Sequence, residues 1–433
     1  MTSSTTVFIL LDAFRWDYVN PVDTPFLHAI TESGVYARRL VSSSGFAQRT
    51  AIFCGTFPDR TGNFAMFTFD PTRSPFGFLA PYAPALAIVQ RVADLGWRGG
   101  GRLRAALHRR CIEPRARKEA VYAPAAFIPL HVLHLIGIAE DEKPIHALGA
   151  LPVESIFDLL HRRGSDYAYV MFPEVNCDDD HTLALVLQRL AERRSLYLVQ
   201  FSDSDLLGHL QGPESAMRHK VAGEIDRKLR ALKRAFEERF EDVTFFVIGD
   251  HGMMQVEETV DVAGLVHGRA RQHGWRHGKD YLLFLDSTLA RLWALDPRAE
   301  GRLADLLDNS LLDRTGARIT ESVATENRLP WGDRRYGDLI WWARPGVLIH
   351  PDYFHPRFQV VKGMHGYDSR HEKMHGFALL HGKRIRPASI AQARLVDICP
   401  TLCDVLGVPA PAQSEGKSLL ASPLIDTGQT GTS

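Results

Sequence analysis

Residues 243–252 read Val-Thr-Phe-Phe-Val-Ile-Gly-Asp-His-Gly, a mostly apolar run that ends in an aspartate, a histidine and a glycine. A short run of this kind is typical of a strand buried on both faces of a parallel sheet. The pattern occurs twice more, because residues 7–11 lead into Asp12 and residues 196–201 lead into a segment that contains Asp205. Ligands of open α/β sheets bind beyond the carboxyl ends of the strands. The sequence therefore predicts three strands whose acidic ends meet at one edge of a sheet.

A helix is expected between the second and third of these strands, over residues 213–240. Its apolar residues recur with a period close to 3.6, as on one face of an amphipathic helix. They are Met217, Val221, Ile225, Leu229, Leu232, Phe236 and Phe240. Strand, helix and strand in this order predict a right-handed crossover. The predicted fold class is α/β, with a mostly parallel central sheet sandwiched by helices and with inserted subdomains.

The composition is that of a folded protein without a dominant charge. Of 433 residues, 45% are hydrophobic and 24% are charged, and both Lys+Arg and Asp+Glu number 51. A net charge of zero gives no global basic field for a nucleic-acid polymer or an anionic membrane. No apolar run reaches about 18 residues, so no membrane span is expected. Five cysteines form no disulfide framework, and with no basic leader at the start they predict a reduced, cytoplasmic protein.

The organisation along the chain predicts a single catalytic domain over residues 1–433 with two insertions. Residues 80–148 mix apolar stretches with many arginines and are expected near the site entrance. Residues 256–344 are expected to form a small α/β subdomain. Residues 422–433 are small and polar, which predicts a flexible tail.

Six side chains along the chain are candidate metal ligands. Asp205 and His209 are four residues apart, so on a helix they lie on the same side of one turn and can bind one ion together. Asp250 and His251 follow the third predicted strand. Asp12 follows the first, and His365 lies in a glycine-flanked loop. All six offer oxygen or nitrogen donors without a thiolate, a set that suits Zn²⁺, and also Mn²⁺ or Fe.

Six protein ligands are more than one ion usually takes, which predicts two divalent ions. Two metals about 4 Å apart hold the attacking and leaving oxygens of a phosphoryl displacement. Three carboxylates, three neutral imidazoles and two divalent ions leave a net charge near +1. Such a site suits an anionic ester.

The order of these motifs resembles the alkaline phosphatase superfamily, and most of all its type I phosphodiesterase/nucleotide pyrophosphatase branch. Residues 10–15, Leu-Leu-Asp-Ala-Phe-Arg, resemble the family's opening Asp-Gly-Phe-Arg. Residues 205–213 resemble its Asp-x-x-Gly-His-x-x-Gly-Pro, and residues 249–253 its Asp-His-Gly-Met. Residues 363–368 and 396–409 resemble its late segments. The matches follow the family's order over nearly the whole chain.

The resemblance implies an alkaline phosphatase-like fold and assigns the ligands to two ions. Asp205, His209 and His365 would hold one ion. Asp12, Asp250 and His251 would hold the other, together with a serine or threonine nucleophile at a helix N-terminus. That hydroxyl would form a covalent phospho-enzyme, which water then hydrolyses.

At the nucleophile the chain departs from the family. Residues 54–59, Cys-Gly-Thr-Phe-Pro-Asp, resemble the family's Thr-Gly-x-Tyr-Pro-Glu, and counting back from them leads to Gly45, which has no side chain. We predict that the adjacent Ser44 begins the next helix as its N-cap, acts as the nucleophile and contacts a metal. Ser43 and Ser42, and then Thr50, are alternatives. Arg49, one helical turn after Gly45, either contacts the transferred group or forms a structural ion pair.

The predicted function is a two-metal hydrolase that cleaves a small-molecule phosphate ester, a phosphodiester or nucleotide pyrophosphate, through a phospho-serine. A phosphotransferase or phosphomonoesterase on the same fold is an alternative. A sulfatase would need Cys/Ser-x-Pro-x-Arg, whereas residues 45–49 read Gly-Phe-Ala-Gln-Arg. A metal-binding pseudoenzyme is a third possibility, which Gly45 favours. The complete ligand set opposes it, because buried carboxylates without metal repel each other. The sequence indicates no partner proteins.

Overall fold

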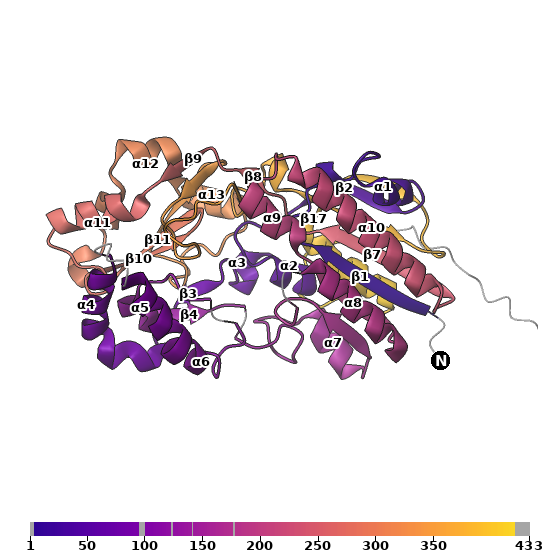
Figure 1. Cartoon of the computed structure of the whole chain (residues 1–433), viewed down its shortest axis with the longest axis horizontal. Helices are drawn as coiled ribbons and strands as arrows, with labels where there is room; N and C mark the ends of the chain where they lie inside the picture. The colour runs from indigo at the N-terminus through magenta and orange to yellow at the C-terminus, as the bar shows by residue number, and fades with distance from the viewer. Residues whose placement is uncertain (1–3, 95–99, 123, 141, 176–177, 421–433) are drawn as a thin grey trace, which may run out of the picture.

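A computed structural model of the chain describes residues 4–420, apart from 95–99, 123, 141 and 176–177. The predicted tail, 422–433, lies outside the described residues. Figure 1 shows two lobes: a central sheet between helices, and a second lobe with α4, α5, α11 and α12 at its outer end.

The central sheet has seven strands in the order β17-β2-β16-β7-β1-β6-β5. The only strand of this sheet that runs against its neighbours is β16, which pairs antiparallel with β7 and with β2. The mostly parallel sheet expected from the sequence is thereby confirmed. The strands are β1 (Ser4–Leu11), β2 (Val35–Val41), β5 (Tyr167–Val170), β6 (Leu196–Phe201), β7 (Asp242–Gly249), β16 (Gly376–His381) and β17 (Ala388–Arg394).

Helices cover both faces of this sheet because its central strands are apolar on both sides. In β1, Val7 and Ile9 face one hydrophobic core, whereas Phe8 and Leu10 face another. The first core includes α8 (Asp179–Arg189) and α10 (Met217–Glu237), and the second includes α2 (Gln48–Cys54), α7 (Ile156–Arg162) and α14 (Ile398–Leu406). Strands buried in this way explain the near-continuous apolar runs in the sequence.

The helix expected over residues 213–240 is α10, and it is shorter at both ends. Its apolar stripe, from Val221 to Phe236, is buried, as its period predicted. A separate short helix, α9 (Asp203–Gln211), precedes it and carries the Asp205 and His209 pair on one turn. The backbone turns at Gly212, which has a φ of +89° and separates the two helices.

The second lobe is built on an antiparallel sheet in the order β10-β11-β13-β12. Its strands are β10 (Tyr281–Asp286), β11 (Leu289–Ala294), β12 (Gly316–Arg318) and β13 (Leu339–Ala343). The helical segment α4 (Ala83–Asp94), α5 (Gly100–Leu107) and α6 (Glu113–Ala116) lies beside it (Figure 1). Buried residues of both segments belong to one hydrophobic core. The two stretches that the sequence suggested as separate insertions thus pack on each other.

Two short strand pairs connect the lobes. β8 (Met254–Gln255) pairs antiparallel with β15 (Gly363–Met364), and β9 (Glu258–Val260) pairs parallel with β14 (Val347–Ile349). The pairing of Met254 with Met364 places the segment just after β7 next to the loop that contains His365.

Two expectations from composition concern cysteines and membrane spans. Four cysteines among the described residues are free thiols, and of these Cys399 and Cys403 are buried. Among the described helices, none combines the length and the apolar composition that a membrane crossing needs.

One buried ion pair lies within the second sheet, and its arginine also contacts strand β3. Arg291 on β11 is fully buried, and its Nε lies 2.6 Å from Asp286 Oδ2 at the end of β10. The same guanidinium donates from Nη1 to the carbonyl oxygen of Phe67, 2.8 Å away, on β3 (Phe67–Phe69). Removing one partner of such a pair leaves an uncompensated charge in the core.

We therefore expect Arg291→Ala to lower the free energy of unfolding by about 3–5 kcal/mol. Arg334→Ala, which removes the exposed partner of Asp338, is the control and should cost less than about 1 kcal/mol. Urea unfolding followed by circular dichroism measures both. Equal losses in the two variants would contradict a dominant role for the buried pair.

Candidate active site

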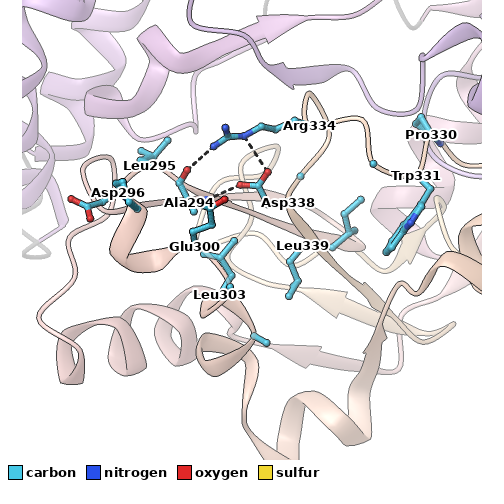
Figure 2. A pocket seen from close by; sticks show the side chains of 16 residues that line it. Ala294, Leu295, Asp296, Glu300, Leu303, Pro330, Trp331, Arg334, Asp338 and Leu339 are labelled. Atoms are coloured by element: carbon cyan, nitrogen blue, oxygen red, sulfur yellow. Dashed lines mark hydrogen bonds and ion pairs between the residues drawn. The ribbon is translucent and has the colours of Figure 1, made fainter.

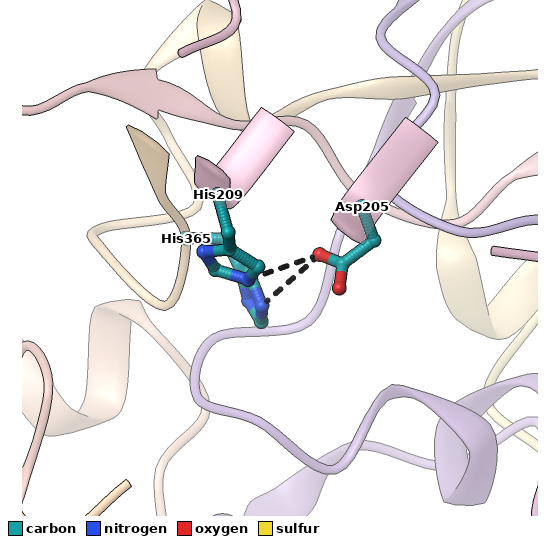
Figure 3. Close-up of side chains that lie close together, drawn as sticks. All are labelled: Asp205, His209 and His365. Carbon is teal, nitrogen blue, oxygen red and sulfur yellow. Dashed lines mark ion pairs between the residues drawn. The ribbon is translucent and has the colours of Figure 1, made fainter. Parts of the chain in front are cut away.

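The first group of candidate ligands joins helix α9 to the loop after β15. Asp205 Oδ1 lies 3.2 Å from His209 Nε2 and 3.6 Å from His365 Nε2. Figure 3 shows the carboxylate directed at both imidazole rings. The ligand atoms of these three residues all lie within 4.8 Å of one another, so they could hold one metal ion.

The second group forms where β1 and β7 end. His251 Nε2 lies 3.3 Å from Asp12 Oδ1 and 3.7 Å from Asp250 Oδ2, and these three residues could also hold one ion. Because β1 and β7 are parallel neighbours, Asp12 and Asp250 emerge side by side. Ala13, with a φ of +54°, directs its N–H to Asp250 Oδ1 at 3.2 Å.

The two groups are adjacent. The ring centroids of His251 and His365 are 4.3 Å apart, with an angle of 31° between the planes. The structure thus brings all six predicted ligands together, although they come from four separate stretches of the sequence. The β8–β15 pairing explains this contact, since it fixes the His365 loop against the chain that leaves β7.

Hydrogen bonds orient two of the imidazoles for metal binding. His209 Nδ1 lies 2.8 Å from the carbonyl oxygen of Gly363, and His251 Nδ1 lies 2.9 Å from that of Gly252. A carbonyl oxygen only accepts, so each Nδ1 carries a proton and leaves Nε2 to face the acidic groups. Asp205 Oδ1 is buried and makes no hydrogen bond within the described part of the chain. A cation between Asp205 and the histidines would satisfy this oxygen, so the residues fit a metal.

The pKa shifts of the candidate ligands also favour a bound cation at this site. Burial opposes a charged ring at His251, but Asp250 and Asp12 outweigh it and raise the pKa of His251 to about 10. Burial raises the pKa of Asp250 to about 7 despite the neighbouring imidazole. At His365, burial lowers the pKa well below its usual value, and the charge of His251 adds to the effect. A divalent ion would therefore displace protons from the second group.

The loop with the predicted nucleophile differs from the expectation. Helix α2 begins at Gln48 with Ala47 in the N-cap position, so the prediction that Ser44 caps it is wrong. The Ser44 hydroxyl instead lies 3.0 Å from Asn327 Oδ1 and 2.9 Å from Ser369 Oγ. Gln48 instead holds the loop before the helix, since its Nε2 donates to the carbonyl oxygens of Ser43 and Gly45. The Ser43 hydroxyl is buried without a hydrogen-bond partner among the described residues.

Gly45 cannot accept a side chain in this conformation. Its φ is +92°, and a Cβ there would lie 2.2 Å from the carbonyl oxygen of Phe64 and 2.4 Å from its ring. The Phe64 carbonyl is held in place because it accepts a hydrogen bond of 2.8 Å from Phe46 N. The Phe46 ring in turn packs edge-on against His365, with centroids 5.5 Å apart.

The side chains of Arg49 and Thr50 are both bound by Glu140. Arg49 Nη2 lies 3.1 Å from Glu140 Oε2 and its Nη1 donates to the carbonyl oxygen of Phe172. Thr50 Oγ1 donates to Glu140 Oε1 at 2.6 Å. The structural ion pair, one of the two expectations for Arg49, is therefore present. Through Glu140, the segment 80–148 contacts helix α2.

Two further groups lie beside the ligands, and of these the sequence analysis missed Gln200. Gln200 Nε2 donates to Asp12 Oδ2 at 3.0 Å, and a glutamine within the apolar run 196–201 was the available signal. His355 has its ring centroid 6.2 Å from that of His209, and its Nδ1 lies 2.8 Å from Asp352 Oδ2. A Pro-containing loop surrounds His350 and His355, and from the sequence these two histidines are expected to line the substrate entrance.

A separate cleft lies elsewhere in the described part of the molecule. It measures about 700 Å³ and lies on the second lobe, between residues 294–304 and 330–340. Figure 2 shows Arg334 beside Asp338 in this cleft, and Trp331 on its wall. None of the six candidate ligands lines it, so it does not bear on the metal groups.

The fold and the paired ligand groups define a class, the hydrolases with an alkaline phosphatase-like fold. The model of the family "Type I phosphodiesterase / nucleotide pyrophosphatase" matches residues 6–79 and 157–368. The chain therefore belongs to this family, within the alkaline phosphatase superfamily, and the sequence-based assignment is confirmed. By family it is a phosphodiesterase/nucleotide pyrophosphatase-like hydrolase.

Similar proteins extend over most of the chain. Human ectonucleotide pyrophosphatase/phosphodiesterase family member 5 is 22% identical over 418 residues, which cover 93% of this chain and 74% of that protein. Human family member 7 is 22% identical over 435 residues, covering 97% and 83%. The structure of the murine member 5 superposes with a TM-score of 0.65 at 18% identity and covers 94% of this chain and 96% of that one. This likeness confirms the predicted fold class.

The conformation at Gly45 can be tested through stability. We expect Gly164→Ala, at a φ of +61° with nothing described within 4 Å, to cost about 1–2 kcal/mol for the left-handed backbone alone. Gly45→Ala should cost about 1–3 kcal/mol more, because its methyl group also meets Phe64. Chemical denaturation measures both variants. A Gly45→Ala variant no less stable than Gly164→Ala would show that the loop relaxes freely.

Proposed function

We propose that this protein is a two-metal hydrolase of small-molecule phosphate esters, either phosphodiesters or nucleotide pyrophosphates. The observation that carries the proposal is the contact between two ligand groups, each with oxygen and nitrogen donors and each sized for one ion. Asp205, His209 and His365 would hold one ion, and Asp12, Asp250 and His251 the other. Two bound ions would polarise the phosphate and hold the attacking and leaving oxygens.

Zinc suits the donor set best, with manganese or iron as alternatives. Three imidazoles and three carboxylates, with no thiolate, are borderline to hard ligands. Surrounding groups of this chain hold the ligands in place. The carbonyls of Gly363 and Gly252 fix two rings, while Gln200 holds Asp12. Such contacts orient ligands before the metal binds.

For the attacking group we propose Ser44. Its hydroxyl would form a bond to phosphorus while the ester oxygen departs, and water would then cleave the phospho-serine. The hydrogen bonds to Asn327 and Ser369 hold this hydroxyl in the resting protein. A change of its rotamer would therefore precede attack. Arg49, bound to Glu140, would support the loop rather than contact the substrate.

The solved structures of relatives support a nucleotide as one substrate class. An inactive variant of the murine member 5 has been solved in complex with AMP. A cytoplasmic location remains our proposal from the sequence, while the two human relatives carry the prefix "ecto" in their names.

A second candidate function is a metal-binding protein without turnover. The observation that favours it is Gly45, whose position the Phe64 carbonyl keeps free of any side chain. Whether Ser43 or Ser44 acts as the nucleophile in place of Gly45 decides between the two functions.

Metal removal tests the proposed function directly. We expect the purified full chain to contain two divalent ions by elemental analysis, and to release nitrophenol from bis-(p-nitrophenyl) phosphate. Chelation should abolish release, and zinc or manganese should restore it. Asp250→Asn should lower turnover by at least about 100-fold, since it removes a ligand rather than a supporting contact.

Asp338→Asn, in the cleft of Figure 2, is the matched control and should leave turnover unchanged. Equal turnover in chelated and metal-loaded protein would disprove the two-metal mechanism. Bound metal without turnover on phosphodiesters, phosphomonoesters and sulfate esters would favour the second candidate.

The phospho-serine step makes its own prediction. Ser44→Ala should reduce turnover by about 10³-fold or more with both ions retained, because the variant lacks the attacking hydroxyl. Ser42→Ala is the control, since that hydroxyl donates to the carbonyl oxygen of Met374. Mass spectrometry of acid-quenched protein should find phosphate on residue 44. Loss of turnover only in Ser43→Ala would move the role to Ser43.

A further inference from the structure

We propose that His355, held in place by Asp352, contacts the phosphate ester bound at the metal groups and is a residue for substrate binding. The proposal rests on the proposed function, because it needs an anionic ester at the two ions. Neither residue belongs to the six candidate ligands or to the loop of residues 42–50.

The position of His355 is the first argument. It lies in the segment between β14 and β15, and its ring is tilted by 55° against that of His209 at a centroid distance of 6.2 Å. The same segment is tied to helix α9, since Lys362 N donates to the carbonyl oxygen of His209 at 2.7 Å. His355 therefore stands beside the first ligand group on a backbone attached to one of its ligands.

The orientation of the ring is the second argument. Asp352 is nearly fully buried, and its Oδ1 accepts from the backbone amides of Phe354 and His355 at 3.1 and 2.8 Å. Its Oδ2 accepts from Ser287 Oγ at 2.6 Å and from His355 Nδ1 at 2.8 Å. The hydrogen bond through Nδ1 fixes the ring, and Nε2 lies on the ring edge away from the carboxylate.

His355 is placed for the substrate rather than for the metal. The groups of described residues that could hold an ion contain His209 and His365 but not His355. An imidazole that neighbours the ligands of an ion, without binding the ion itself, can contact a molecule bound to that ion. With Nδ1 held by Asp352, the ring offers Nε2 for a hydrogen bond with the bound ester.

A purely structural role is the competing explanation, and the hydrogen bonds of Asp352 argue against it. Without the ring, the carboxylate keeps three hydrogen bonds, from Ser287 Oγ and from two backbone amides. The turn is therefore satisfied without the imidazole. His219, on helix α10, forms a pair of the same kind with Asp23 at 2.9 Å and provides a matched control.

The test uses the zinc-loaded full chain and inorganic phosphate as the probe, with calorimetric titration at one fixed pH. We expect His355→Gln to weaken phosphate binding by about 10-fold or more, the range for a lost hydrogen bond to a charged group. His219→Gln should bind like the parent. Elemental analysis should find the same metal content in all three proteins.

Asp352→Asn tests the positioning role. It should weaken phosphate binding less than His355→Gln does, and the double variant should be no weaker than His355→Gln alone, because both changes remove one contact. Additive losses would indicate that Asp352 acts independently of the ring.

Each other outcome is decisive. Unchanged phosphate affinity in His355→Gln, or a parent protein that holds both ions without binding phosphate, overturns the proposed contact. Loss of an ion in His355→Gln makes His355 a metal ligand and also overturns it. A parent protein that binds no divalent ion contradicts the proposed function itself, a result that the metal analysis distinguishes from the others.

Discussion

Acidic side chains that are buried side by side need compensating positive charge, and this constraint shapes the whole site. Asp12, Asp205 and Asp250 converge where strands β1, β6 and β7 end, and three imidazoles face them. Asp250 and Asp12 raise the pKa of His251 against the effect of burial, and burial raises the pKa of Asp250, so a divalent ion bound there would displace protons. The surrounding carbonyls, Gln200 and the β8–β15 pairing keep the six groups in contact. Everything proposed for the chemistry depends on this arrangement.

Much of this arrangement could be predicted from the sequence because it follows from local periodicity. Apolar runs that end in acidic residues place Asp12 and Asp250 at the same sheet edge, and a four-residue spacing puts Asp205 and His209 on one turn of α9. For His365, both the glycine-flanked loop and the family's late motif were signals in the sequence. Its contact with His251 depends on the pairing of β8 with β15, strands of two residues each, which are too short to leave a signal.

The remainder depends on packing between distant segments, which no local pattern encodes. The serine run 42–44 suggested a hydroxyl cap, but Gln48 reaches back and satisfies the loop from inside the helix. Glu140 decides the role of Arg49 from ninety residues away. The two stretches that appeared as independent insertions share one hydrophobic core, and neither sequence alone shows that the other covers it. The role proposed for Asp352 and His355 follows from the contact between the rings of His355 and His209, which no local pattern encodes.

The contact between Gly45 and Phe64 limits how residue 45 can change by mutation. Once a backbone carbonyl fills the space where a side chain would stand, restoring a hydroxyl there takes more than one substitution, since the segment around Phe64 must move first. Each intermediate sequence along that path would carry the steric conflict without the benefit. Descendants of this chain are thus expected to diverge around a permanent glycine, and compensating changes should accumulate in its neighbours instead.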